Sequence, residues 1–166
     1  MMRYIQAAMA PVLILAVFGQ ASYSAEKETT NRMRLSNVEH RLVQAVNAHR
    51  AEHRLPPLLV DPALMHVARQ SAPHFSHQIN GKWCWHRARE AGFAGWATDD
   101  IANGYATPEE AVQGWATSHG HAMQMRGHFK MNGRWQNYRF NRIGVGVSGR
   151  KYIAVFGRTE ERRPPR

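Results

Sequence analysis

The chain has 166 residues, with 22 Lys or Arg against 12 Asp or Glu, so its formal charge is +10. Its 43% hydrophobic and 20% charged residues are typical of one globular domain with a single core, which excludes a structureless chain. The lone cysteine, Cys84, excludes an intrachain disulfide and a cysteine-rich zinc site.

The N-terminal residues have the pattern of a secretory signal. A short positive start at Met1–Arg3 precedes the uncharged apolar stretch 5–18, and small residues follow it. We predict a signal peptide over residues 1–24 and a flexible lead-in over 25–35. A membrane anchor is the alternative, but about 14 apolar residues are fewer than the ~20 that span a bilayer. We therefore expect a secreted or periplasmic protein with no transmembrane segment after cleavage.

Two helices are predicted next, each from its N-terminal cap. Ser36 and Glu39 fit a capping box, which starts a helix that must end before Pro56. Its expected inward residues are Val38, Leu42, Ala45, Val46 and His49. Asp61 before Pro62 starts the second helix by the same logic. Its expected buried residues are Leu64, Ala68, Ala72 and Phe75, with Pro73 kinking or ending it.

Two further helices are predicted between residues 81 and 120. A short helix around Cys84 is closed by Gly92, and Cys84, between two tryptophans, is interpreted as a small buried filler rather than a nucleophile. Thr107 before Pro108 starts the fourth helix, which we expect to end at Gly120.

The hydrophobic period changes from helical to alternating after Phe140. Residues 143–147 and 152–156 are predicted to form a β-hairpin, and the glycines between its apolar residues predict close packing on one side. Together, the predicted helices and strands indicate an α+β fold with helices around a small, mostly antiparallel sheet. The C-terminal residues 159–166 are predicted to be a disordered basic tail.

Basic charge is concentrated in the second half of the chain. No acidic residue lies between Glu110 and Glu160, whereas eight basic residues do: Arg126, Lys130, Arg134, Arg139, Arg142, Arg150, Lys151 and Arg158. A one-signed surface attracts polyanions. Because export is expected, an anionic envelope polymer or lipid headgroup is favoured over nucleic acid; the alternative is that the charge only aids solubility.

Three residues near predicted element ends are candidates for a site. His77 follows the second helix, His121 follows the fourth, and Asp99 is expected in the loop between them. Two imidazoles and a carboxylate suit a divalent cation such as zinc. A lone surface histidine, by contrast, implies no such site.

Several short motifs, taken together, resemble those of one family. They are Val46-Asn47-Ala48-His49-Arg50, Leu55-Pro56-Pro57-Leu58, Asp61-Pro62-Ala63-Leu64, Phe75-Ser76-His77, Ile101-Ala102, Thr107-Pro108-Glu109-Glu110, Ser118-His119-Gly120-His121 and Ile143-Gly144-Val145-Gly146-Val147. Their order and spacing resemble the CAP superfamily (SCP/TAPS; cysteine-rich secretory protein, antigen 5, pathogenesis-related 1), most closely its short bacterial branch without disulfides. The resemblance implies a CAP domain over residues 36–158.

The resemblance also implies an exported α-β-α sandwich with a central cleft where histidines and acids bind a divalent ion. His77 and His121 match the two family histidines. The family's Gly-Glu-Asn motif falls on Thr98, Asp99 and Asp100, so all three positions differ. Asp99 keeps the charge of the family glutamate but is one methylene shorter.

The stretch 124–142 is longer than the resemblance leads us to expect and mixes cations with aromatic rings. Such side chains grip phosphates or sugar faces. We therefore name Arg126, Arg134, Trp135 and Tyr138 as candidate ligand-binding residues. The alternative is a variable surface loop.

Two functions from different classes fit these residues. The first is a binding module for a lipid, sterol or anionic envelope glycan, with a cation as an optional aid. The second is a metal-assisted hydrolase, in which His77, His121 and Asp99 hold the ion and Glu109 or Glu110 supplies an acid or base. A basic exported nuclease suits the charge but not the fold signals. The sequence contains neither His-Glu-x-x-His nor Gly-x-Ser-x-Gly, so it supports neither a zincin-type protease nor an α/β-hydrolase serine esterase.

Overall fold

The structure is a computed structural model that describes residues 34–159. The predicted signal peptide, the tail from residue 160 and most of the predicted lead-in lie outside the described residues. The chain divides into two units, residues 1–34 and 35–166, and the elements below belong to the second. None of the helices formed within residues 34–159 is long and apolar enough to cross a membrane.

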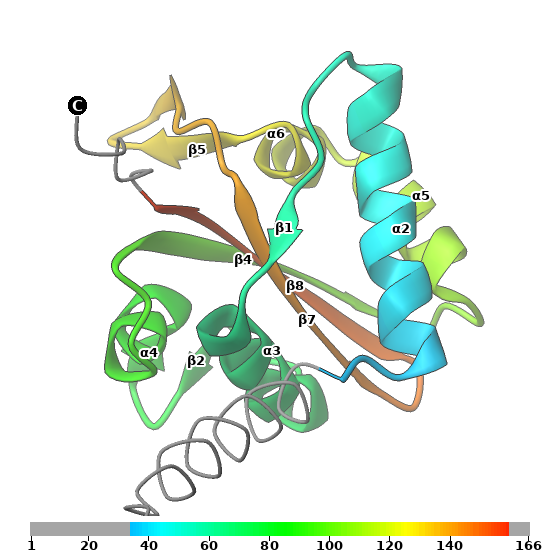
Figure 1. Cartoon of the computed structure of the whole chain (residues 1–166), viewed down its shortest axis with the longest axis horizontal. Coiled ribbons are helices and arrows are strands. Elements are labelled where there is room, and N and C mark those ends of the chain that lie inside the picture. The colour runs from blue at the N-terminus through cyan, green and yellow to red at the C-terminus, as the bar shows by residue number, and fades with distance from the viewer. Residues whose placement is uncertain (1–33, 160–166) are drawn as a thin grey trace, which may run out of the picture. The chain divides into compact units, whose positions relative to one another are not determined.

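A mixed four-stranded sheet forms the centre of this unit. Its strands, in spatial order, are β1 (Leu59–Val60), β7 (Arg142–Ser148), β8 (Lys151–Thr159) and β4 (Gly95–Asn103). β1 pairs in parallel with β7, and the other two pairings are antiparallel (Figure 1). β7 and β8 are the predicted terminal hairpin, which is confirmed, and β4 is an edge strand.

Helices cover both faces of the sheet (Figure 1). They are α2 (Asn37–Glu52), α3 (Pro62–His74), α4 (Cys84–Glu90), α5 (Pro108–Thr117) and α6 (His119–Met125). Ile153 and Val155 of β8 belong to the hydrophobic cluster formed with α3 and α4, whereas Ala154 and Phe156 belong to the cluster formed with α2, α5 and α6. This alternation follows from the period of two along a strand. The predicted α+β class and α-β-α sandwich are therefore confirmed.

The glycines of β7 allow α3 to lie directly on the sheet. A Cβ atom built on Gly144 would lie 2.0 Å from the carbonyl carbon of Leu64, and one on Gly146 would lie 2.2 Å from the carbonyl oxygen of Ala68. Contact at this distance leaves no room for any side chain. The predicted close packing on this side of the hairpin is confirmed.

The predicted helix starts are also confirmed by their caps. Ser36 and Glu39 form both hydrogen bonds of the capping box, and the Asp61 carboxylate accepts from two backbone N–H groups of the first turn of α3. Thr107 caps α5 in the same manner. These bonds join residues at most three positions apart, so the local sequence is sufficient to predict them.

Three details of the helix predictions were wrong. Phe75 is not a buried residue of the second helix, because it ends α3 in the left-handed conformation and is half-buried. Val38 is 37% exposed, and its neighbour Glu39 is buried instead, because Arg69 of α3 holds the Glu39 carboxylate at 2.7 Å. Gly120 does not end the fourth helix. α5 stops at Thr117 because Ser118 is extended, with φ −92° and ψ 117°, and Gly120 then lies inside α6.

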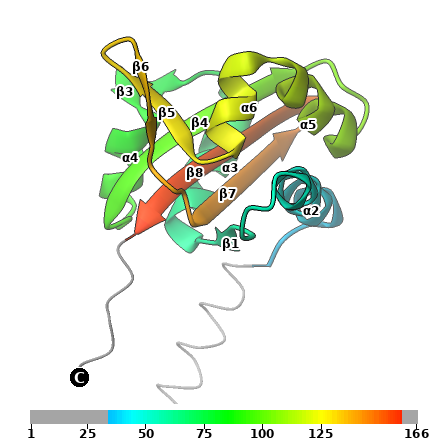
Figure 2. The same ribbon diagram turned by 90° about the horizontal axis from the view of Figure 1, so that it is seen from above.

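The stretch 124–142 forms the end of α6 and a β-hairpin, β5 (His128–Met131) and β6 (Arg134–Asn137), which projects beside α6 (Figure 2). Asn132 and Gly133 make its two-residue turn with φ of 49° and 79°, as a right-twisted hairpin requires. Phe129 of β5 packs against Trp96 of β4, with ring centroids 4.2 Å apart. A short additional hairpin, β2 (Gln78–Ile79) and β3 (Lys82–Trp83), precedes α4.

Candidate functional site

His77 and Asp99 come together beside the edge strand of the sheet. Asp99 does not lie in the predicted loop: it is in the middle of β4, opposite Val155 of β8, and is 5% exposed. His77 follows the left-handed Phe75 that ends α3. His77 Nδ1 lies 3.2 Å from Asp99 Oδ2. The Asp99 carboxylate raises the pKa of His77, which favours the imidazolium. Asp99 Oδ2 nevertheless makes no aligned hydrogen bond within residues 34–159, so this buried oxygen keeps free acceptor capacity.

His77 and Asp99 line a cavity of about 520 Å³ whose walls also include three tryptophans and a phenylalanine. The wall residues are His77, Trp83, Cys84, Trp85, Trp96, Ala97, Thr98, Asp99, Gln124, Phe129 and Met131. Because β4 is an edge strand, side chains from both of its faces reach the same space. The Thr98 hydroxyl donates to Gln124 Oε1 at 2.7 Å and thereby ties β4 to α6. The cavity combines apolar walls with a polar floor, the usual character of a small-molecule site.

Cys84 lies in the cavity wall but is not suited to nucleophilic attack. The residue is 2% exposed. Burial and the neighbouring Asp99 carboxylate raise the pKa of its thiol well above the usual value. A thiol that stays protonated is a weak nucleophile. Its interpretation as a buried filler agrees with this environment.

His121 lies outside that cavity. It lines a different space of about 350 Å³, together with Phe75, Tyr105 and Ser118. Burial and the nearby charge of His77 lower the pKa of His121, so neutral imidazole is favoured there. His77 and His121 are thus electrostatic neighbours that face separate cavities.

A three-ligand cation site is therefore not assembled from the candidate residues. Within residues 34–159, no group of three or more His, Cys, Asp or Glu side chains is placed to hold one ion. His77 and Asp99 supply two donors at the floor of the cavity.

The candidate residues in the 124–142 stretch also lie outside the aromatic cavity. Arg134 is exposed on β6, and Trp135 packs its ring edge against His119 at 5.6 Å. Tyr138 stacks on Trp96, with ring centroids 5.0 Å apart, but is not among the residues that line the cavity. Arg126 is half-buried at the end of α6. Within this stretch, Gln124, Phe129 and Met131 line the cavity instead.

The two glutamates considered for hydrolysis, Glu109 and Glu110, make hydrogen bonds away from this cavity. Glu109 accepts two hydrogen bonds from Arg41, at 2.9 and 2.6 Å, which joins α5 to α2. Glu110 accepts from the backbone N–H of Ala106. Neither glutamate is among the residues that line the cavity above His77 and Asp99.

Sequence reasoning missed most of the cavity wall. Trp83, Trp85 and Trp96 are distant from the 124–142 stretch in sequence, and only the fold places them opposite Phe129. One local signal was available. Trp83 and Trp85 flank Cys84 and follow His77 closely in the chain, so the aromatic character of that segment was visible.

Asp100 is the one residue of the altered motif that is fully buried. Both of its carboxylate oxygens lack a hydrogen-bond partner among the described residues. Burial, and then the charge of Asp99, raise the pKa of Asp100 well above its usual 3.8. The folded protein therefore holds a proton on Asp100 at pH values where the unfolded chain has released it.

Asp100→Asn is expected to raise the free energy of unfolding by about 2 kcal/mol at pH 7. Because the folded pKa is the higher one, wild-type stability falls as pH rises from about 3.8 through the raised value. The gain should therefore vanish near pH 3, where Asp100 is protonated in both states. Urea unfolding of both proteins at the two pH values measures this, and an equal difference at both would contradict a titrating Asp100.

Comparison with known proteins identifies the family. Residues 43–153 match the cysteine-rich secretory protein family, CAP. An uncharacterized protein of Bacillus subtilis, YkwD, is 30% identical over 138 residues, which are 76% of this chain and 50% of that protein. The chain belongs to the CAP family, as the motifs indicated. It spans about half the length of the curated relative that it matches.

Solved structures agree with this assignment. An extracellular SCP-domain protein of Bacillus anthracis is 25% identical, with a TM-score of 0.61 over 73% of this chain and 40% of its own. An outer surface protein of Borrelia burgdorferi has a TM-score of 0.62 at 16% identity, over 77% of this chain and 97% of its own. A Staphylococcus aureus cysteine-rich secretory protein has a TM-score of 0.62 at 14% identity, over 74% of this chain and 39% of its own. The last two likenesses show the fold alone.

Proposed function

We propose that this protein is an exported binding module that holds an amphipathic ligand in the aromatic cavity above His77 and Asp99. The aromatic walls of that cavity carry the proposal. Tryptophan and phenylalanine rings bind flat apolar faces, as in a sterol, a lipid chain or the face of a sugar. Export is supported by the N-terminal pattern and by the similar Bacillus anthracis protein, which is described as extracellular.

The polar floor supports a ligand that also carries a hydroxyl group. Besides its contact with His77, Asp99 Oδ2 has a further lone pair that can accept a hydrogen bond from such a donor. His77 Nδ1 lies 3.2 Å from this oxygen and holds the carboxylate in position. Sterols, lipid headgroups and envelope glycans all combine an apolar or ring face with hydroxyls, and an anionic glycan would also suit the basic second half of the chain.

Binding is tested with three probes: dehydroergosterol, a fluorescent fatty acid and a soluble peptidoglycan fragment. Trp83→Ala removes one aromatic side chain from the cavity wall and is expected to lower the affinity for the bound probe by about tenfold. Trp135→Ala is the matched control, because Trp135 lies outside the cavity and contacts His119. Equal affinities of the two variants, or no binding of any probe, would contradict the proposal.

The same titrations with EDTA and with added zinc test the optional cation. His77→Ala and Asp99→Asn remove the two donors that the structure brings together. If an ion assists binding, EDTA lowers the affinity of the wild type for the probe and does not change the affinity of these variants. No observation on the described residues favours hydrolysis over binding, since neither Glu109 nor Glu110 faces this cavity.

A further inference from the structure

A second cavity, also of about 520 Å³, lies against α3 and α4 and shares no residue with the His77 cavity. Its walls include His66, Gln70, Asn80, Lys82, Arg87 and Glu90. The β2–β3 hairpin separates the two spaces. Lys82 lines one and the next residue, Trp83, lines the other, because successive side chains of a strand point to opposite sides.

Arg87 is the unusual member of this wall. It is only 7% exposed, and its Nη1 donates to Ser71 Oγ at 2.8 Å. Ser71 is fully buried and donates its own hydroxyl proton to the carbonyl of Val67, so the contact fixes one side of the guanidinium. The other side is unsatisfied. Nε and Nη2 of Arg87 have no hydrogen-bond partner among residues 34–159.

The free side of Arg87 is the edge that binds carboxylates elsewhere in this molecule. Arg41 donates from Nε and Nη2 to the two oxygens of Glu109, at 2.9 and 2.6 Å. Arg69 does the same to Glu39, at 2.7 and 2.9 Å. This Nε–Nη2 fork matches the spacing of two oxygens on one carboxylate or phosphate. Arg87 presents the same fork without an acceptor.

No internal counter-ion explains the buried charge. None of the carboxylates described in residues 34–159 lies within 4.0 Å of the Arg87 guanidinium. Glu90 of the same wall is already paired with Lys82 at 2.5 Å, and both of those side chains are about half exposed. An unpaired buried charge is costly, so a partner from outside is favoured.

We propose that this cavity binds an oxyanion, a phosphate or carboxylate group, through the Nε–Nη2 edge of Arg87. Gln70 and Asn80 provide neutral side-chain donors around the same space, and His66 adds an imidazole from the next turn of α3. Lys82 and Glu90 form the polar rim. This site is independent of the aromatic cavity and does not rest on the function proposed for it.

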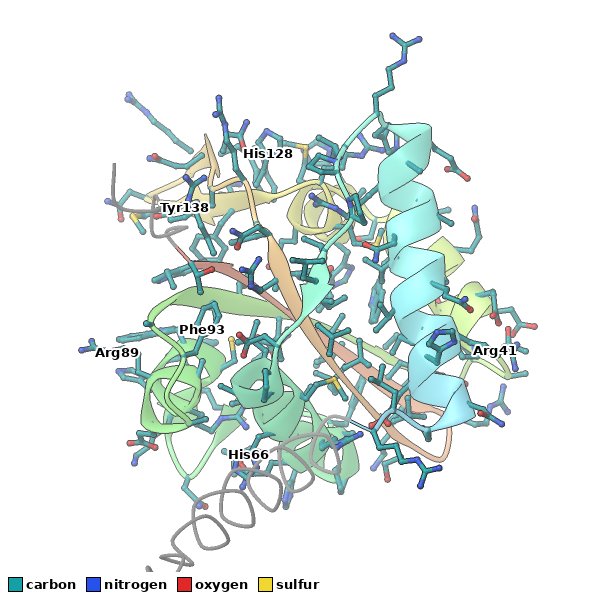
Figure 3. All side chains as sticks on the ribbon, in the orientation of Figure 1. Arg41, His66, Arg89, Phe93, His128 and Tyr138 are labelled. Atoms are coloured by element: carbon teal, nitrogen blue, oxygen red, sulfur yellow. The ribbon has the colours of Figure 1, made fainter. Side chains whose placement is uncertain are left out.

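Titration of the purified protein with inorganic phosphate, and separately with acetate, at constant ionic strength tests the site. The ¹H–¹⁵N signal of Arg87 Nε–H should shift and saturate with at least one of the two anions, which also identifies the preferred oxyanion. Arg87→Gln is expected to lower the affinity for that anion by about tenfold or more. Arg89→Gln removes the same charge from an exposed position on α4 (Figure 3) and should leave the affinity unchanged.

A second variant keeps the test decisive if Arg87→Gln does not fold. Gln70 is exposed on α3, so Gln70→Glu should fold normally while placing a carboxylate in the cavity wall. Charge repulsion then lowers the anion affinity at unchanged melting temperature. Equal affinities of wild type and Gln70→Glu would overturn the proposal. An Arg87 signal that does not respond to either anion would do so too, and would assign the free edge to bound water.

Discussion

Replacing Arg50 by methionine is expected to lower the free energy of unfolding by about 3–5 kcal/mol. Arg50 is 2% exposed and donates to three backbone carbonyls, from Nε to Pro56, from Nη1 to Met125 and from Nη2 to Phe140. These carbonyls follow α2, end α6 and precede β7. Burial lowers the pKa of Arg50 to about 10, so the side chain remains charged at neutral pH. Methionine fills a similar volume but leaves all three acceptors buried without a donor.

Chemical denaturation of wild type and Arg50→Met at pH 7 measures the loss. Arg89→Met is the control, since Arg89 is exposed on α4 and should change stability by less than about 0.5 kcal/mol. A domain of this size has a total stability of roughly 5–15 kcal/mol, so the expected loss is a large share of it. Similar stabilities of the two variants would show that Arg50 does not hold these three segments together.

Gly144→Ala is expected to lower the free energy of unfolding by about 3 kcal/mol or more, although it adds a single methyl group. The new Cβ would lie 2.0 Å from the carbonyl carbon of Leu64 and 2.3 Å from the amide nitrogen of Met65. Both are backbone atoms, which cannot rotate away as a side chain can. α3 must therefore separate from β7, which loosens the contact between that helix and the sheet.

Gly120→Ala is the same chemical change, but we expect it to cause no loss of stability. Gly120 lies inside α6, and a Cβ built there meets no atom within 4 Å. Alanine favours the helix over glycine, so this variant should be neutral or more stable by up to about 1 kcal/mol. Thermal and urea unfolding of both variants compare the two sites. A destabilised Gly120→Ala with an unaffected Gly144→Ala would contradict the close packing of α3 on β7.

Local signals predicted the elements correctly where the interacting groups are neighbours in sequence. The capping bonds of Ser36, Asp61 and Thr107 involve residues two or three positions away, and alternation alone indicates the β7–β8 hairpin. The same locality explains the errors. Glu39 is buried by Arg69, thirty residues later, and such a partner leaves no trace in the pattern of α2 itself.

Local patterns in the sequence were enough to predict the start of each long helix, the terminal hairpin and the family, and to single out His77, Asp99 and His121 as candidates, but not to place Asp99 in a strand. The tertiary structure decided which of those three share a cavity and which aromatic rings surround it. It also decided that Arg50, Arg87 and Asp100 are buried. The reason is physical: caps and periodicity depend on hydrogen bonds and side-chain direction within a few residues, whereas a cavity wall and the burial of a charge depend on which distant segments pack together.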